Sequence, residues 1–307
     1  MRSLTLAAAL FTAAACASSP GPEGSEPSAA PVVEAERAFA RDGLALGIAA
    51  SFNKWAVPGA VMIAGGRVST VAEVYPPDRP RPPDEPKLEW CPNFAGIARS
   101  GDLGFTTGGV AVNGQRAGHY FTIWKKQSDG SWRWVYDGGN GATAKDVPGP
   151  ETEPVTLPLG ARLLQVRYAG QPAPPPPPAD WALSEVKAEE AALAREAATD
   201  QKAAHLARMA DDGRLYVALL PPAIGRAAFD EALTAWPATF SFGPTEGGGQ
   251  SEYGDLVWTY GSAAWTRDGQ ARRGHYVRLW QRREEGFRIV LAQLIPAPPP
   301  QAPPAPN

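Results

Sequence analysis

The chain has 307 residues, enough for two ordinary domains, and 44% of its residues are apolar, enough for two cores. Its net charge of −3 comes without a basic cluster, which excludes the electrostatic signature of a nucleic-acid-binding protein. Its 33 prolines, about twice the average usage, gather in clusters and predict linkers.

The first residues resemble a bacterial lipoprotein signal. Arg2 precedes an apolar run over 4–15, which is typical of a secretory signal and shorter than the roughly 20 residues that span a bilayer. Small residues lead to Cys16, which would become the lipidated first residue, although Ala13 stands where leucine is usual. We therefore expect a signal peptide over 1–16 and an exported outer-membrane lipoprotein on the periplasmic side of the cell envelope. The alternative is an ordinary signal cut near Ala-Cys-Ala.

The second cysteine, Cys91, has no disulfide partner if Cys16 carries lipid. A buried, small apolar role is favoured for it over a nucleophile. Two cysteines and three scattered histidines do not form a metal-ligand pattern. The chain also lacks a phosphate-binding loop and a dinucleotide fingerprint, so we expect neither a metal nor a cofactor.

Proline-rich stretches divide the chain. We predict a flexible tether over 17–31, a linker over 146–180 and a disordered tail over 296–307. Two segments of similar size remain, 32–145 and 181–295. Matches such as Gly-His-Tyr at 118–120 and at 274–276 follow in the same order at a nearly constant offset, which indicates an internal duplication.

Each copy is predicted to begin with a helix and to close with strands, which is an α+β plan. In the first copy four apolar residues recur at helical spacing and define one stripe: Leu44, Ile48, Phe52 and Trp55. The second helix is predicted to be capped by Ser184 and stopped at Gly213. The strands are rich in aromatic and β-branched residues, with tight turns at Asp129-Gly130 and Glu285-Gly286.

Several segments together resemble one superfamily: AERAFA with Glu36, SGDLGFTTG, GHYFTIWKK and DGSWRWVYDGG. They are similar to the SnoaL-like or ketosteroid-isomerase-like superfamily, which shares the nuclear transport factor 2 fold. The resemblance implies two tandem cone-shaped domains, each with helices packed on a curved antiparallel sheet. It also implies sheet pairing, either as a pseudo-dimer within the chain or as a homo-oligomer. Members include isomerases, dehydratases and non-catalytic binding modules, so the resemblance indicates fold more than function.

Strand alternation predicts which residues face the inside of each cone. In the second copy Arg278 lies opposite the histidine face, and an arginine favours solvent. The face expected inside is therefore that of His119, Phe121, Ile123, His275, Val277 and Leu279. A histidine there is either a general acid or base, or a neutral residue hydrogen-bonded to a buried partner.

Asp137 ends the last strand of the first copy, and the second copy has Ala292 or Gln293 at that place. In an apolar cone its pKa would rise and it could abstract a proton next to a carbonyl group. The competing interpretation is that Asp137 begins the turn that follows. If Leu291 points into the second cone, strand alternation by analogy would place Asp137 outside the first cone. Asp102 and Asp255 are interpreted as turn residues. The remaining candidates are pocket residues that could equally be core: Trp90, Phe121, Ile123, Tyr136 and His275.

Two hypotheses follow. The first is an exported, lipid-anchored cell-envelope protein whose tandem SnoaL-like domains serve as a ligand-binding or interaction module. The alternative makes the first domain an acid–base enzyme of the isomerase or lyase type, acting on a small apolar carbonyl compound through His119 and Asp137, with a degenerate second domain. The expected partners are a small apolar ligand and the membrane through the lipid anchor alone.

Overall fold

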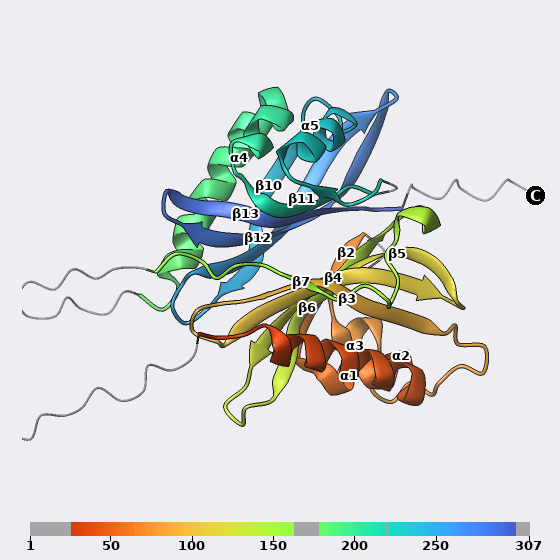
Figure 1. Ribbon diagram of the computed structural model, residues 1–307. Helices are drawn as coiled ribbons and strands as arrows, with labels where there is room; N and C mark the ends of the chain where they lie inside the picture. The colour runs from red at the N-terminus through yellow and green to blue at the C-terminus, as the bar shows by residue number, and fades with distance from the viewer. Residues whose placement is uncertain (1–25, 65, 163–177, 219, 299–307) are drawn as a thin grey trace, which may run out of the picture.

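The computed structural model describes residues 26–64, 66–162, 178–218 and 220–298 (Figure 1). The predicted signal peptide, Cys16 and most of the tether lie outside the described residues, as do much of the proline linker and the end of the tail. Among the described helices, none combines the length and the apolarity that a bilayer crossing requires.

The first domain lays its helices against one side of a seven-stranded sheet with the order β2-β1-β6-β5-β4-β3-β7. Its elements are α1 (Ala30–Leu46), α2 (Ile48–Trp55), β1 (Ala56–Ala64), β2 (Arg67–Thr70), α3 (Val71–Val74), β3 (Leu88–Ile97), β4 (Leu103–Val112), β5 (Gln115–Lys126), β6 (Trp132–Gly141), a 3-10 turn (Ala144–Asp146) and β7 (Val155–Thr156). The strand β7 comes from the segment predicted as linker and pairs with β3 at the sheet edge.

The second domain repeats this plan with a six-stranded sheet in the order β10-β11-β12-β13-β8-β9. Its elements are α4 (Trp181–Leu206), β8 (Met209–Tyr216), β9 (Ala223–Ile224), α5 (Arg226–Thr234), β10 (Ser241–Gln250), β11 (Leu256–Arg267), β12 (Gln270–Arg283) and β13 (Gly286–Pro296). Both sheets contain a parallel pair, β1 with β6 and β8 with β13, inside an otherwise largely antiparallel arrangement. The predicted α+β class, two tandem cone-shaped domains, is confirmed.

The predicted helix details need correction. Gly47, at φ 90°, separates α1 from α2, so the apolar stripe does not run through one helix. Leu44 consequently remains 45% exposed, while Phe52 is buried. The second helix begins at Trp181 after Asp180, not at Ser184, and Gly213 lies within β8 instead of stopping the helix.

A β-bulge at the same place in both domains changes which side chains share a face. Between β5 and β6, Ile123 pairs with Tyr136 but Trp124 pairs with Trp134, so Val135 is an extra residue. The same shift occurs between β12 and β13. An extra residue interrupts the two-residue alternation, so side chains after the bulge switch faces relative to those before it.

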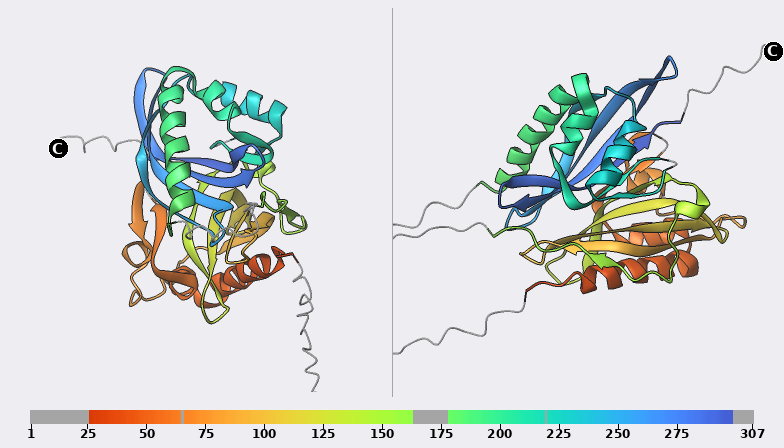
Figure 2. Two further views of the ribbon diagram at one scale, coloured as in Figure 1. Left: turned by 90° about the vertical axis from the view of Figure 1, so that its left-hand side faces the viewer. Right: turned by 45° about the horizontal axis from the view of Figure 1, so that its top comes forward.

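The face predicted to lie inside the cones packs instead between the two sheets. In Figure 1 the helices of the first domain lie below and those of the second lie above, with both sheets between them, and the turned views of Figure 2 agree. One buried apolar cluster joins the two sheets and includes Phe121, Ile123, Tyr136, Trp258, Val277, Leu279 and Ile295. The inward assignment of the histidine face is therefore wrong, because each sheet is covered on both sides.

Equivalent loops of the two domains bind each other reciprocally. The Arg99 amide donates to the Asp255 carboxylate at 2.8 Å, and the Glu252 amide donates to the Asp102 carboxylate at 3.2 Å. A contact that is made twice with exchanged roles is what a two-fold relation produces. The two aspartates predicted as turn residues thus lie in their loops and also connect the domains.

Candidate functional site

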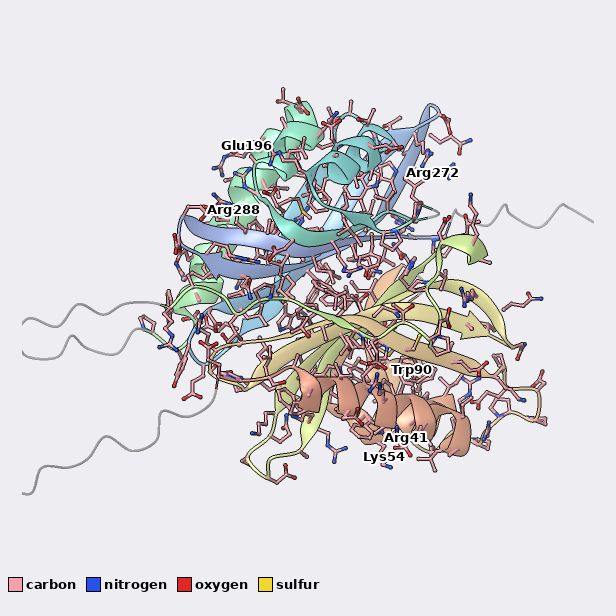
Figure 3. All side chains as sticks on the ribbon, in the orientation of Figure 1. Arg41, Lys54, Trp90, Glu196, Arg272 and Arg288 are labelled. Carbon is pink, nitrogen blue, oxygen red and sulfur yellow. The ribbon has the colours of Figure 1, made fainter. Side chains whose placement is uncertain are left out.

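A buried glutamate connects the first helix to the sheet inside the first cone. Glu36 of α1 is fully buried, and its carboxylate accepts hydrogen bonds from Trp90 Nε1 at 2.6 Å, from Trp124 Nε1 at 2.9 Å and from the Thr106 hydroxyl. Burial raises the pKa of Glu36, and these donors oppose the rise. Figure 3 shows Trp90 next to α1, from which Glu36 accepts its indole hydrogen bond.

The second cone contains the same arrangement with one addition. Glu190 of α4 accepts from the Thr259 hydroxyl at 2.6 Å and from Trp280 Nε1 at 2.8 Å. It also forms an ion pair with the fully buried Arg278. The Arg278 guanidinium stacks on Phe242 and Tyr276, at 4.4 and 4.1 Å from their ring centroids. The cation therefore neutralises Glu190 and occupies the interior of the second cone.

Strand register identifies what replaces this cation in the first cone. Arg278 pairs with Ala292 across β12 and β13, while Thr122 pairs with Asp137 across β5 and β6. Thr122 thus stands where the second domain has Arg278, and Asp137 where it has Ala292. Among the described residues neither Glu36 nor Asp137 forms an ion pair. In the part of the chain that the structure describes, the carboxyl groups of Glu36 and Asp137 thus lie in the first cone without a paired cation.

Asp137 faces the interior of the cone, which corrects the expectation that it lies outside. The bulge at Val135 places Tyr136 between the sheets and Asp137 on the helix side. The Thr122 hydroxyl donates to Asp137 Oδ2 at 2.8 Å. Burial, and then the nearby charge of Glu36, raise the pKa of Asp137 well above its usual value. The carboxyl group is therefore held in its neutral form well above the pH at which an exposed aspartate ionises.

Asp137 lines a cavity of about 320 Å³ with walls that are mostly apolar and aromatic. Its lining includes Phe52, Met62, Tyr75, Leu88, Trp90 and Tyr120, and glycines of β5 and β6 form another part. Burial and the Asp137 charge raise the pKa of Tyr75 to about 12. Burial and the Glu36 charge raise that of Tyr120 well above 10. Both phenols thus stay protonated at neutral pH, and a phenol in that form is a hydrogen-bond donor.

The two predicted catalytic residues do not meet. His119 belongs to the rim of the cavity, but its ring packs against Tyr216 of the second domain, with centroids 5.2 Å apart. Burial lowers its pKa, partly offset by Asp146, and its Nε2 has no hydrogen-bond partner among the described residues. The imidazole therefore lies neutral between the domains, on the opposite face of the sheet from the Asp137 side chain.

The predicted pocket residues divide between two environments. Trp90 lines the cavity, whereas Phe121, Ile123 and Tyr136 belong to the core between the sheets. His275 has its Nε2 3.9 Å from Glu246, and burial lowers its pKa. The prediction of ligand contact by these last four residues rested on the inference that Arg278 faces solvent, whereas Arg278 is buried inside the second cone.

Cys91 is half-buried, and burial raises the pKa of its thiol, so it is held in the protonated form. Within the described ranges, no group of three or more histidine, cysteine, aspartate or glutamate side chains is placed to hold a metal ion.

Comparison with known proteins returned solved structures only. No protein-family model and no curated protein matches the chain. A ketosteroid isomerase-like protein from Erwinia carotovora atroseptica is 18% identical, covers 39% of this chain and 98% of its own, and has a TM-score of 0.32. An NTF2-like protein with a cystatin-like fold from Novosphingobium aromaticivorans is 17% identical, covers 38% and 81%, and has a TM-score of 0.31.

A third structure, a protein of unknown function with a cystatin-like fold from Nostoc punctiforme, is 17% identical, covers 38% of this chain and 93% of its own, and has a TM-score of 0.30. The arrangement of the chain itself carries the assignment of fold: each half places helices on one side of a curved, bulged sheet. In fold, the chain is two tandem cone-shaped α+β domains.

Proposed function

We propose that the first cone domain is a binding module for a small apolar compound that carries a carbonyl group, and that the second domain is its scaffold. The observation that carries the proposal is the Asp137 carboxyl, which lines an apolar cavity in a cone without a neutralising cation. The second cone has lost this group and is occupied by Arg278. We further propose that the protein is exported and held to the cell envelope by lipid on Cys16.

The chemistry of the cavity supports a neutral ligand with one polar atom. A neutral carboxyl and the protonated phenol of Tyr75 are donors that suit a carbonyl oxygen, while an anionic ligand would meet the Glu36 charge. The cavity volume of about 320 Å³ lies at the lower end of the roughly 300–1,000 Å³ of small-molecule sites. The aromatic walls favour a compact, flat apolar body.

A second function, acid–base catalysis, is favoured by the pairing of Asp137 with nearby phenols. The minor, ionised form of Asp137 would take the proton from the carbon next to the carbonyl, and the phenol of Tyr75 would donate a hydrogen bond to the developing oxyanion. In heavy water, catalysis would exchange that proton for deuterium. The wild type is expected to promote this exchange, and the variant D137N is expected not to. If the wild type binds the ligand but does not promote exchange, the catalytic proposal is wrong and the first domain is a binding module only.

Transplanting the residues of the second cone into the first tests the proposal. In the double variant T122R/D137A, an arginine at position 122 is expected to pair with Glu36 and fill the cavity. Binding of cyclohexanone or acetophenone, followed by tryptophan fluorescence, is expected to fall at least tenfold while the domain stays folded. The matched variant D129N changes an exposed turn aspartate and should bind as the wild type does. Undiminished binding by T122R/D137A would refute the cavity as the site.

The anchoring part of the proposal has its own test. The variant C16A removes the residue proposed to carry lipid, so the protein is expected to leave the membrane fraction of expressing cells and to lose incorporation of labelled palmitate. The variant C91A, which removes the other cysteine, should keep both. Recovery of the wild type as an unacylated soluble periplasmic protein would contradict the anchor.

A further inference from the structure

The end of β6 carries no side chain on the face that it turns to the cone cavity. Side chains two residues apart on a strand share a face, so Gly139 and Gly141 follow Asp137 on the cone side. Gly141 pairs with Gly118 of β5, and all three glycines line the cavity. Asp137 is buried, whereas Gly141 is exposed. These glycines, called the glycine strip below, therefore lead from the buried carboxyl to the surface.

The second cone has side chains at two positions of the same strip. By the register given above, Leu294 and Pro296 of β13 stand where β6 has Gly139 and Gly141. Leu294 is buried and belongs to the apolar core on the helix side of the second sheet. The first cone thus lacks, besides the arginine, the two side chains that cover this end of the second cone.

Packing between the strands explains only part of the glycine strip. A Cβ atom at Gly118 or Gly139 would lie 2.3 or 2.5 Å from a carbonyl oxygen of the neighbouring strand, so a side chain does not fit at either position. At Gly141 the nearest atom to a Cβ would be the Ala117 carbonyl oxygen at 3.8 Å, and the φ angle lies outside the left-handed region. Neither packing nor backbone conformation therefore requires glycine at 141, and its effect is to leave the mouth of the cavity uncovered.

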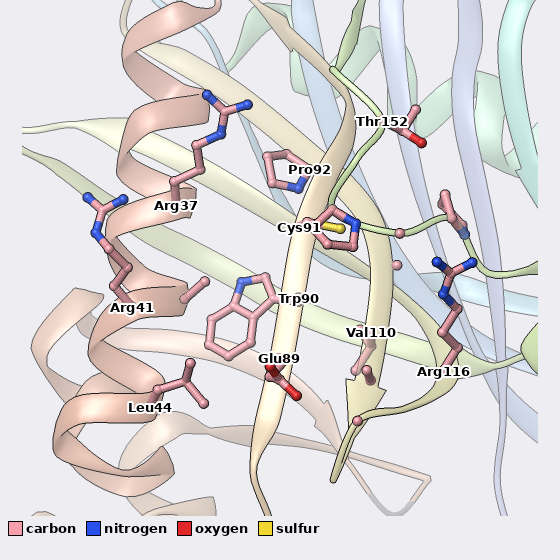
Figure 4. Close-up of a pocket in the computed structure, with 17 residues that line it drawn as sticks. Arg37, Arg41, Leu44, Glu89, Trp90, Cys91, Pro92, Val110, Arg116 and Thr152 are labelled. Carbon is pink, nitrogen blue, oxygen red and sulfur yellow. The ribbon is translucent and has the colours of Figure 1, made fainter.

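The rest of the mouth is apolar. Figure 4 shows Trp90 of β3 next to Val110, its partner on β4, and both line the cone cavity. Two polar side chains of the lining are turned towards the second domain. Asn140 Nδ2 donates to a carbonyl oxygen of that domain at 3.4 Å, and the ring of His119 packs against a tyrosine there. A ligand that passes through the mouth consequently meets hydrocarbon and glycine backbone.

We propose that the ligand of the first cone is a ketone with a hydrocarbon tail, and that the tail leaves the cavity over Gly139 and Gly141. The inference rests on the proposed function, because it places the carbonyl group at Asp137. A compact ligand would leave its outer end in water, since β6 has no counterpart of Leu294 to cover it. A tail along the glycine strip would cover the apolar rim, and each methylene removed from water adds to the affinity.

The test compares acetophenone with hexanophenone, which has the same ring and carbonyl group and a longer alkyl chain. Binding to the full-length protein is followed by tryptophan fluorescence. The wild type is expected to bind hexanophenone at least tenfold more tightly than acetophenone. In G141L the leucine covers the strip, so this gain should fall below threefold while acetophenone binds within twofold of the wild type. The control A144L places a leucine at an exposed residue that does not line the cavity, and should keep the wild-type gain.

The milder variant G141A, whose methyl group has room, carries the comparison if leucine disturbs β6, and is expected to reduce the gain at least twofold. A gain that persists in both variants would overturn the inference but not the binding of acetophenone at Asp137. If the wild type does not bind acetophenone, the proposed function itself is wrong, and this inference with it. Hexanophenone binding that is retained in T122R/D137A would place the ligand outside the cone and overturn the inference as well.

Discussion

Replacing Arg278 by methionine is expected to destabilise the protein by about 3–5 kcal/mol, the range found when one partner of a buried ion pair is removed. Arg278 and Glu190 are both buried and paired with each other. Methionine fills most of the volume but leaves the Glu190 carboxylate without a cation inside the cone. The loss should appear as a lower midpoint in urea-induced unfolding, followed by tryptophan fluorescence.

The double variant R278M/E190Q is the control that assigns the effect to charge. Glutamine keeps an oxygen to accept from Thr259 and Trp280, so most of the lost stability should return. The variant R272M removes an arginine outside the cone and is expected to change stability by no more than about 0.5 kcal/mol. If R278M alone were as stable as the wild type, Glu190 would not depend on the cation for its burial.

The two copies thus use the same helix glutamate in two different ways. In the second cone the carboxylate of Glu190 is neutralised by a cation that also fills the interior. In the first cone the carboxylate of Glu36 relies on hydrogen-bond donors alone, and the space left by the missing arginine borders a cavity with Asp137. A buried cation and an open cavity are therefore alternatives at one position of the fold, which is occupied by Thr122 in the first cone and by Arg278 in the second.

The sequence predicted the fold well because its signals are local or repeated. The turns at Asp129-Gly130 and Glu285-Gly286 join adjacent antiparallel strands as predicted, with Gly130 at φ 83° and Gly286 at φ 116°. Positive φ angles favour glycine, so these dipeptides mark their turns irrespective of the surroundings. The ordered matches between the halves likewise identified two copies of one domain.

The site was less predictable because it depends on a bulge and on distant partners. Nothing local marks Val135 as an extra residue, yet the bulge decides that Asp137 points into the cone. The inference that an arginine favours solvent failed at Arg278, since its partner Glu190 comes from a helix 88 residues earlier. One signal was available: the two opening helices carry glutamates at nearly the same place, Glu36 in AERAFA and Glu189-Glu190 in AEEAAL.

Replacing Asp137 by asparagine is expected to raise stability at neutral pH and to flatten its dependence on pH. The folded-state pKa of Asp137 is raised by burial and by Glu36, so folding favours the protonated carboxyl. Its stabilising contribution is fully present below the unfolded pKa of about 4 and is lost as pH rises towards the folded pKa. Over that interval the slope for one proton approaches about 1.4 kcal/mol per pH unit.

The measurement is the free energy of unfolding in urea from pH 4 to pH 8, for wild type, D137N and D129N. The wild type should lose stability as pH rises through this range, and D137N should lose less, because asparagine does not ionise. The pKa of Asp129 is shifted in the opposite direction, because hydrogen bonds from Ser131 lower it. The variant D129N should therefore not gain stability at neutral pH. If D137N is more stable than the wild type at neutral pH and also loses ketone binding, the Asp137 carboxyl lowers the stability of the fold but is needed for the ligand. A pH profile of D137N that matches the wild type would show that folding does not raise the pKa of Asp137, and the proposed neutral donor would be wrong.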